Sequence, residues 1–278
     1  MSDSPHELPI VVLDGLMPTS QRLVLNRRGS TVWQVDTRSG QYAVKLGYPI
    51  EATPEWPAQP WTALAPVREG NVLFQLGVDD IAYGEWEHGT WNIQPWHEGP
   101  DLYRLWEPCR VPGASFEPQV SAALGCVQAL AELHFKGWAH GDVQPAHFIV
   151  GPERMHLIDL ALARGGRVPK AVDFPFRGCL VHYEAPEISR SVLATGEAEP
   201  TEAADIYALG ASLFISATGR RVVDYPDNAP RPVQRRAIVD GRRRAVSMPG
   251  RFATLVREML NYSPENRPTI YEVGKALS

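Results

Sequence analysis

The most constraining feature of this 278-residue sequence is a change of texture about one third of the way along it. Up to about Pro95 the chain is rich in β-branched and aromatic residues, with frequent turn formers between them. The remainder carries apolar residues at helical spacing. This order predicts an α+β fold, with a small β-rich lobe followed by a larger helical lobe.

In the first part, two stretches predict β-hairpins. Residues 30–47, STVWQVDTRSGQYAVKLG, read as two strands around the turn TRSG. Residues 80–96, DIAYGEWEHGTWNIQPW, read as a second hairpin that turns at His88-Gly89. Between the two hairpins, residues 67–77 are compatible with a short helix. We therefore expect a small sheet accompanied by one helix.

In the second part, helical patterns dominate. Residues 116–137 repeat apolar side chains at helical spacing, and residues 201–219 are almost uniformly apolar, as expected of a helix buried on every side. A last helix is predicted from Thr269, because Glu272 three residues later completes a capping-box pattern. Residues 147–160 interrupt the helices and predict a short hairpin.

Composition excludes several classes of protein. A net charge of −5 argues against general nucleic-acid binding, which favours a basic surface. The three cysteines are scattered and suggest neither a disulfide framework nor a zinc site, so a reducing, cytoplasmic setting is expected. No stretch approaches the roughly 20 apolar residues of a membrane span. We expect a soluble cytoplasmic protein.

Two carboxylates stand out as chemical candidates. Asp142 lies in HGDVQPAHFIV, residues 140–150, where a loop with His, Asp and Pro runs into an apolar strand. Such an Asp can accept a hydroxyl proton, although capping a turn is a common structural use of the same residue. Asp159 follows the apolar run HLI, so a buried strand would deliver its carboxylate, for which Mg²⁺ is a natural partner.

A series of short motifs resembles the eukaryotic-type Ser/Thr protein kinases, which bacteria also encode. In the order of that family, the chain carries YAVK (42–45), VREGNVLFQL (67–76), IQPWHEGPDL (93–102), HGD (140–142), LIDLA (157–161), APE (185–187), DIYALG (205–210) and NRPT (266–269). The resemblance covers nearly the whole chain. It implies one bilobal domain at residues 9–278, with an N-lobe at 9–95, a hinge at 94–101, a C-lobe at 102–278 and an ATP cleft between the lobes.

The same resemblance implies a role for each matching residue, with ATP and Mg²⁺ or Mn²⁺ as cofactors. Lys45 would neutralise phosphate oxygens of ATP and Glu69 would hold its ammonium group. Asp142 would be the catalytic base and Asp159 a metal ligand. Further contacts with the nucleotide would come from Gly29, Val32, Ala43, Gln94 and His97. Glu187, Arg267 and Asp205 would be architectural.

Several positions depart from the pattern of the family. The glycine-rich loop keeps only Gly29 and Val32 of its motif. Gln144 replaces the catalytic-loop lysine, which keeps a hydrogen-bond donor but loses the charge. His147 replaces the metal-binding asparagine, and its imidazole is a softer ligand than Mg²⁺ prefers, so His147 would either tolerate Mn²⁺ or merely fill space.

Three functions remain open at this point. The leading prediction is an ATP-dependent phosphotransferase that acts on Ser or Thr of a protein or peptide. The alternatives are a pseudokinase that serves as a regulatory or scaffold partner, and a kinase subunit that phosphorylates a precursor peptide for later phosphate elimination. The arginine-rich segment 231–244 is a candidate docking site for an acidic partner, or else a solvated helix face.

Overall fold

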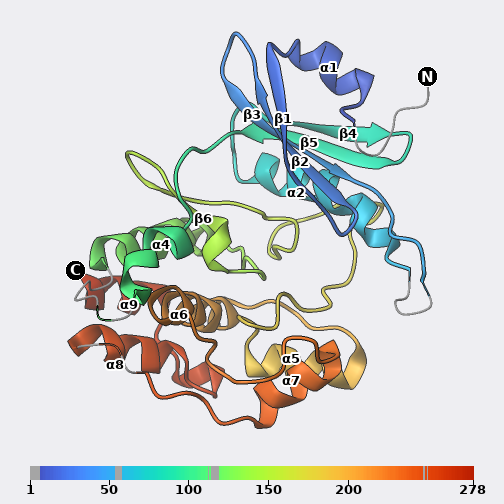
Figure 1. The fold of residues 1–278 in the computed structure, drawn as a ribbon. Helices are drawn as coiled ribbons and strands as arrows, with labels where there is room; N and C mark the ends of the chain where they lie inside the picture. The colour runs from blue at the N-terminus through green and yellow to red at the C-terminus, as the bar shows by residue number, and fades with distance from the viewer. Residues whose placement is uncertain (1–6, 54–57, 112, 114–118, 247, 249) are drawn as a thin grey trace. The chain divides into compact units, whose positions relative to one another are not determined.

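The computed structural model describes residues 7–53, 58–111, 113, 119–246, 248 and 250–278. The chain divides into two compact units. Unit 1 comprises residues 1–96 and 166–174, and unit 2 comprises residues 97–165 and 175–278. A small antiparallel sheet is followed by a mainly helical part (Figure 1), which confirms the predicted α+β fold of the bilobal kinase type.

In the described part of unit 1, five strands form one antiparallel sheet in the order β1-β2-β3-β5-β4. Their bounds are β1 Ser20–Arg27, β2 Ser30–Asp36, β3 Gln41–Gly47, β4 Ala82–Trp86 and β5 Gly89–Pro95. Both predicted hairpins are therefore present, as β2–β3 and β4–β5. The turn from β1 to β2 consists of Arg28 and Gly29, both at positive φ, as a two-residue hairpin of this type requires.

Helices cover both faces of this sheet because its side chains alternate between them. Val44 and Leu46 of β3 face a buried cluster that includes Val12 of helix α1 (Ile10–Leu16). Lys45 projects to the opposite face, toward helix α2 (Ala65–Gln75), which follows the 3₁₀ turn η1 (Pro60–Leu64). The sequence analysis predicts no helix at α1, whose β-branched start favours a strand. Burial of Val12 against the sheet stabilises this short helix.

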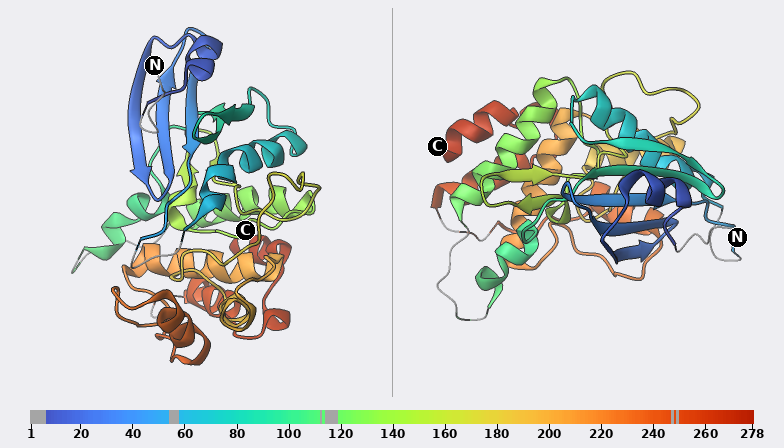
Figure 2. Two further views of the ribbon diagram at one scale, coloured as in Figure 1. Left: turned by 90° about the vertical axis from the view of Figure 1, so that its right-hand side faces the viewer. Right: turned by 90° about the horizontal axis from the view of Figure 1, so that it is seen from above.

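Unit 2 is organised around helix α6 (Glu202–Thr218), which contacts α3, α4 and α8 (Figures 1 and 2). Thr201 caps its start, where the side chain accepts a hydrogen bond from the Ala204 amide, and Gly219 ends it in the left-handed conformation. The other elements are α3 Leu102–Leu105, η2 Glu107–Arg110, α4 Val120–Phe135, α5 Pro186–Thr195, α7 Arg231–Asp240, α8 Gly250–Met259, η4 Pro264–Asn266 and α9 Ile270–Leu277. The capping box predicted at Thr269 is present.

The loop that carries Asp142 ends in the 3₁₀ turn η3 (Pro145–His147) and continues into a two-stranded sheet, β6 (Phe148–Val150) and β7 (Met155–Leu157). This hairpin matches the one predicted for residues 147–160 and delivers Asp159 just beyond its second strand. Among the described residues, no helix has the length and apolar character needed to cross a bilayer.

Candidate active site

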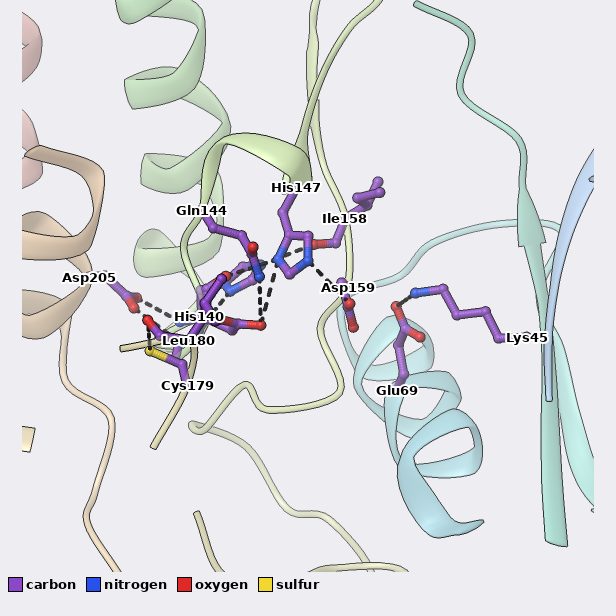
Figure 3. Close-up of polar contacts among 12 residues, drawn as sticks. Lys45, Glu69, His140, Gln144, His147, Ile158, Asp159, Cys179, Leu180 and Asp205 are labelled. Carbon is purple, nitrogen blue, oxygen red and sulfur yellow. Dashed lines mark hydrogen bonds and ion pairs between the residues drawn. The ribbon is translucent and has the colours of Figure 1, made fainter. Parts of the chain in front are cut away.

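In unit 1, the sheet and α2 form a buried ion pair. The Nζ of Lys45 lies 2.7 Å from Oε1 of Glu69, and the two side chains are 13% and 1% exposed (Figure 3). Lys45 reaches α2 because its neighbours Val44 and Leu46 are buried on the other face of the sheet. Lys45 and Glu69, which the kinase resemblance pairs, therefore form an ion pair in the structure.

Asn92 is a second partner of Glu69 that the sequence analysis missed. It stands directly opposite Lys45 in the β3–β5 register, and its Nδ2 donates to Oε2 of Glu69 at 3.0 Å. The same amide donates to the Pro66 carbonyl of α2 at 2.9 Å. Both carboxylate oxygens of Glu69 are thus held, which fixes the group before any ligand binds. The available signal was a lone Asn within the apolar strand TWNIQPW.

Three further residues predicted to contact the nucleotide, Val32, Ala43 and Gln94, share the Lys45 face of the sheet. Val32 pairs with Lys45, and Ala43 pairs with Gln94, whose Nε2 donates to Oδ1 of Asn92 at 3.2 Å. Ala43 and Gln94 are buried. Val32 and Ala43 thus give this face of the sheet an apolar part beside Lys45.

Gly29 is buried in the β1–β2 turn. A side chain there would meet the Tyr48 carbonyl at 2.7 Å, and the Gly29 carbonyl itself accepts a hydrogen bond from the Tyr48 amide. Positive φ and close packing therefore both require glycine at this position. Arg27 and Arg28 beside it are exposed.

In unit 2, Asp205 of α6 holds the backbone of the loop that carries Asp142. Its carboxylate accepts hydrogen bonds from the His140 amide at 2.6 Å and the Gly141 amide at 2.9 Å. His134 of α4 contacts the same carboxylate through Nε2 at 3.0 Å. Asp205 is 2% exposed, so the loop is anchored to a buried charge that the backbone amides stabilise.

The ring of His140 ties this loop to the strand that leads to Asp159. Its Nδ1 accepts a hydrogen bond from the Asp142 amide at 3.1 Å, and its Nε2 donates to the Ile158 carbonyl at 3.1 Å. A neutral imidazole has one acceptor and one donor nitrogen, and here Nδ1 accepts while Nε2 donates. Burial lowers the pKa of His140, which favours the same neutral form.

The carboxylate of Asp142 has one side-chain hydrogen-bond donor among the residues that the structure describes. Gln144 donates from Nε2 to Oδ2 at 3.0 Å, whereas Oδ1 is buried and has no hydrogen-bond partner among the residues that the structure describes. Burial raises the pKa of the Asp142 carboxyl, while the nearby His147 ring and a backbone hydrogen bond from Leu180 oppose this shift. A buried, unpartnered carboxylate oxygen is costly, and such groups occur where a ligand or reacting group completes them.

His147 contacts both Asp142 and Asp159. Its Nδ1 lies 2.9 Å from the Asp142 carbonyl oxygen, which accepts its hydrogen bond, and its Nε2 lies 3.3 Å from Oδ2 of Asp159 (Figure 3). In the neutral ring, the Nε2 lone pair therefore faces a carboxylate. This arrangement fits a shared divalent ion, because a fixed Nδ1–H tautomer is the usual support of a metal-binding histidine.

No group of three or more His, Cys, Asp or Glu side chains in the described part of the chain could hold a metal ion alone. A pair of protein ligands suits an ion that also binds substrate phosphates, as Mg²⁺ does in many phosphoryl-transfer sites. Asp159 itself has φ of 66°, in the left-handed region that non-glycine residues seldom adopt. Such backbone strain concentrates at functional sites.

His97, predicted to contact the nucleotide from the hinge, begins unit 2. Its ring stacks on His156 of β7 with centroids 3.9 Å apart and planes 13° from parallel. Burial lowers the pKa of His97 to about 4, and the positive groups of His156 and Arg154 add to the shift. The ring is therefore neutral at physiological pH.

Two buried ion pairs brace the segment after Asp159. Arg267 contacts both oxygens of Glu187 at 2.7 and 2.8 Å, as expected for the architectural pair. The sequence analysis missed the second pair, Arg235 with Glu184, in which Nε and Nη2 lie 2.7 and 2.9 Å from the two carboxylate oxygens. Several arginines of segment 231–244 thus serve within the chain, because Arg231 also donates to the Cys179 carbonyl.

Comparison with known proteins finds sequence similarity to several protein kinases. The chain is 27% identical to human activin receptor type-1B over 223 residues, which are 75% of this chain and 43% of the receptor. It is 26% identical to mouse serine/threonine-protein kinase 16 over 203 residues, which are 66% of this chain and 63% of that protein.

A plant relative, the L-type lectin-domain containing receptor kinase VIII.2 of Arabidopsis thaliana, is 33% identical over 165 residues, which are 56% of this chain and 22% of that protein. The chain thus spans less than half the length of the receptors that it matches. No protein-family model matches it. The similarity to several Ser/Thr protein kinases, at modest identity, supports a protein-kinase family for this chain.

Proposed function

We propose that this chain is an ATP-dependent phosphotransferase that moves the γ-phosphate of ATP to a Ser or Thr hydroxyl of a protein or peptide. The observation that supports the proposal most is the environment of the Asp142 carboxylate. Its Oδ2 accepts a hydrogen bond from Gln144, whereas its Oδ1 is buried without a partner among the described residues. The kinase relatives support a transferase of this type.

In the proposed reaction, Oδ1 of Asp142 accepts the hydrogen bond of the acceptor hydroxyl and then its proton. The raised pKa of this carboxyl favours proton acceptance, because a base works best when its pKa approaches the working pH. The hydroxyl oxygen bonds to the γ-phosphorus while the bond from that phosphorus to ADP breaks. Gln144 keeps the carboxylate from rotating, and Asp205 keeps the loop in place.

In this proposal, side chains of the chain itself hold the nucleotide. Lys45 neutralises phosphate oxygens, while Glu69 and Asn92 fix its ammonium group. Val32, Ala43, Gln94 and His97 contact the base and sugar, and Gly29 shapes the turn beside them. His147 and Asp159 would hold Mg²⁺ or Mn²⁺, which neutralises phosphate charge when bound.

A non-catalytic ATP-binding partner is the second candidate. It is favoured by His147, whose imidazole is a softer ligand than Mg²⁺ prefers, and by Gln144, which carries no charge at the position of the catalytic-loop lysine. This candidate predicts nucleotide binding without transfer. The two candidates therefore differ in a single measurement.

That measurement is phosphate transfer from γ-labelled ATP, with Mg²⁺ or Mn²⁺, to the protein itself and to a library of Ser and Thr peptides. We expect labelling by the unmodified protein and by Lys275→Met, which removes an exposed lysine of α9. Lys45→Met should abolish it, because the phosphate oxygens lose their buried cation. Equal labelling by both variants would contradict the proposal, and ATP binding without any labelling would favour the non-catalytic candidate.

A further inference from the structure

The segment of residues 166–174, which follows Asp159 in the chain, belongs to unit 1 and is held on helix α2 at two points. At one point, Nε of Arg68 lies 3.0 Å from Oδ1 of Asp173. At the other, the Gln75 side chain accepts a hydrogen bond from the Arg167 amide at 3.0 Å and donates to its carbonyl at 2.7 Å. Gln75 lies two helical turns after Arg68, so both contacts use one side of α2.

The Arg68 contact places a charge in the interior of unit 1. The Arg68 side chain is fully buried, whereas the Asp173 side chain is 42% exposed. A buried guanidinium group needs an anionic partner, because the interior solvates it poorly. The ring of Phe174, itself buried, lies 5.4 Å from the same guanidinium and excludes water from it.

The segment is also organised internally. The amides of Val172 and Asp173 both donate to the Pro169 carbonyl, at 3.0 and 3.1 Å, which forms a turn just before the Asp173 carboxylate. The turn and the two contacts with α2 together fix both ends of the segment. Arg68 directly precedes Glu69 on α2. Helix α2 therefore holds the segment through Arg68 and the Lys45 ammonium through Glu69.

Residues 160–182 contain no Ser, Thr or Tyr. A common way to order a flexible segment is phosphorylation, in which a new phosphate pairs with an arginine. This segment offers no hydroxyl for that purpose. The segment instead carries the carboxylate of Asp173, which contacts the buried guanidinium of Arg68.

We propose that Arg68 and Asp173 form a permanent clamp that orders residues 166–174 on α2, so that the chain is competent without phosphorylation of this segment. Arg68 and Asp173 are positioning residues in this proposal. The competence rests on the function proposed above, whereas the clamp itself does not. The two claims can therefore fail separately.

Hydrogen exchange followed by mass spectrometry tests the clamp without any assay of activity. The probe is the backbone amides of residues 170–174 in protein treated with phosphatase and verified by mass as unphosphorylated. In the unmodified protein these amides should be protected, because the turn at Pro169 is held in place. Asp173→Asn should exchange at least ten-fold faster there, since it loses the charge and keeps the shape.

Two variants serve as controls. Asp79→Asn makes the same chemical change at an exposed site of unit 1 and should leave exchange in residues 170–174 unchanged. Asp173→Glu keeps the charge and should restore most of the protection. Equal exchange in the unmodified protein and Asp173→Asn would overturn the clamp. Faster exchange that extends equally to α6 would also overturn it, because the variant would then have lost stability globally.

Transfer from labelled ATP tests the consequence. The phosphatase-treated protein should transfer phosphate at the rate of the untreated protein, within two-fold. Asp173→Asn should lower kcat several-fold with little change in the KM for the acceptor, and Asp173→Glu should recover kcat. A fall of more than ten-fold after phosphatase treatment would overturn phosphorylation-independent competence. No transfer by any form, with the exchange result intact, would instead reject the proposed function and leave the clamp standing.

Discussion

Glu69 and Asp142 are both acidic residues that accept a hydrogen bond from an amide side chain, Asn92 in the first case and Gln144 in the second. The second oxygen of Glu69 meets the Lys45 ammonium, whereas that of Asp142 is buried without a partner among the described residues. The Glu69 carboxylate in unit 1 therefore has a partner on each oxygen, whereas the Asp142 carboxylate in unit 2 has one oxygen without a partner among the described residues. A carboxylate with partners on both oxygens can hold a neighbouring group in place, whereas one with an unpartnered oxygen can accept a bond from a substrate.

The largest expected difference follows from replacing each carboxylate by its amide. Glu69→Gln removes the carboxylate charge that faces the Lys45 ammonium, which is 13% exposed. Removing one partner of a buried ion pair typically costs about 3 to 5 kcal/mol, so unit 1 should lose about 3 kcal/mol of unfolding free energy. Urea denaturation measures this loss. Glu87→Gln, at an exposed turn, is the matched control and should change stability by less than about 0.5 kcal/mol.

Asn92→Ala should have the next largest effect. It removes the donor that holds both Glu69 and the Pro66 carbonyl, which leaves buried acceptors unsatisfied. The expected cost is about 1 to 3 kcal/mol. Asn228→Ala, at an exposed loop, controls for the loss of an amide. A near-zero effect of Asn92→Ala in urea denaturation would mean that Lys45 alone positions Glu69.

Asp142→Asn should change stability in the opposite direction from Glu69→Gln. The pKa of the Asp142 carboxyl is raised by burial, so its ionised form is unfavourable in the folded protein near neutral pH. A neutral amide removes this penalty, and the variant should gain about 1 kcal/mol, as often happens when a reactive group is removed from a functional site. Loss of stability in thermal or urea unfolding would show that the carboxylate is structural.

The smallest expected effect concerns pH and His97. Because burial lowers the pKa of this histidine from its usual 6.5 to about 4, the unfolded chain binds a proton between these values and the folded chain does not. Its contribution to stability is therefore complete above about pH 6.5 and is lost as pH falls toward 4. His97→Asn should reduce the loss of unfolding free energy between pH 7 and pH 5 by about 1 kcal/mol, allowing for partial exposure. An unchanged pH dependence in urea denaturation would contradict this assignment.

The sequence predicted the parts of this comparison that depend on residue identity at fixed local spacing. Both hairpins and the capping box at Thr269 follow from patterns along the chain, whereas the Lys45–Glu69 pair follows from the resemblance to protein kinases. The α+β fold follows from the change, near Pro95, from β-branched and aromatic residues to apolar residues at helical spacing. Periodicity and turn chemistry are local properties, so a single sequence carries them.

The parts that were missed depend on approach between distant residues. Arg68 meets Asp173 across 105 positions, and Arg235 meets Glu184 across 51. Nothing in the local pattern marks which of many arginines will be buried with a carboxylate. Helix α1 was missed for a related reason, because its burial against the sheet decides its conformation over the strand preference of Ile10 and Val11.

The most direct test of the contrast between a supporting and a reacting carboxylate is to measure ATP affinity and phosphate transfer together in Asp142→Asn. Calorimetric titration gives the Kd for ATP with Mn²⁺ or Mg²⁺, and labelled ATP gives the rate of transfer. Asp240→Asn, at the exposed end of α7, is the matched control. We expect Asp142→Asn to keep its Kd within about three-fold while transfer falls by about 10²- to 10⁴-fold, the usual contribution of a general base. Transfer at the rate of the unmodified protein, or a loss of affinity as large as the loss of transfer, would contradict the account.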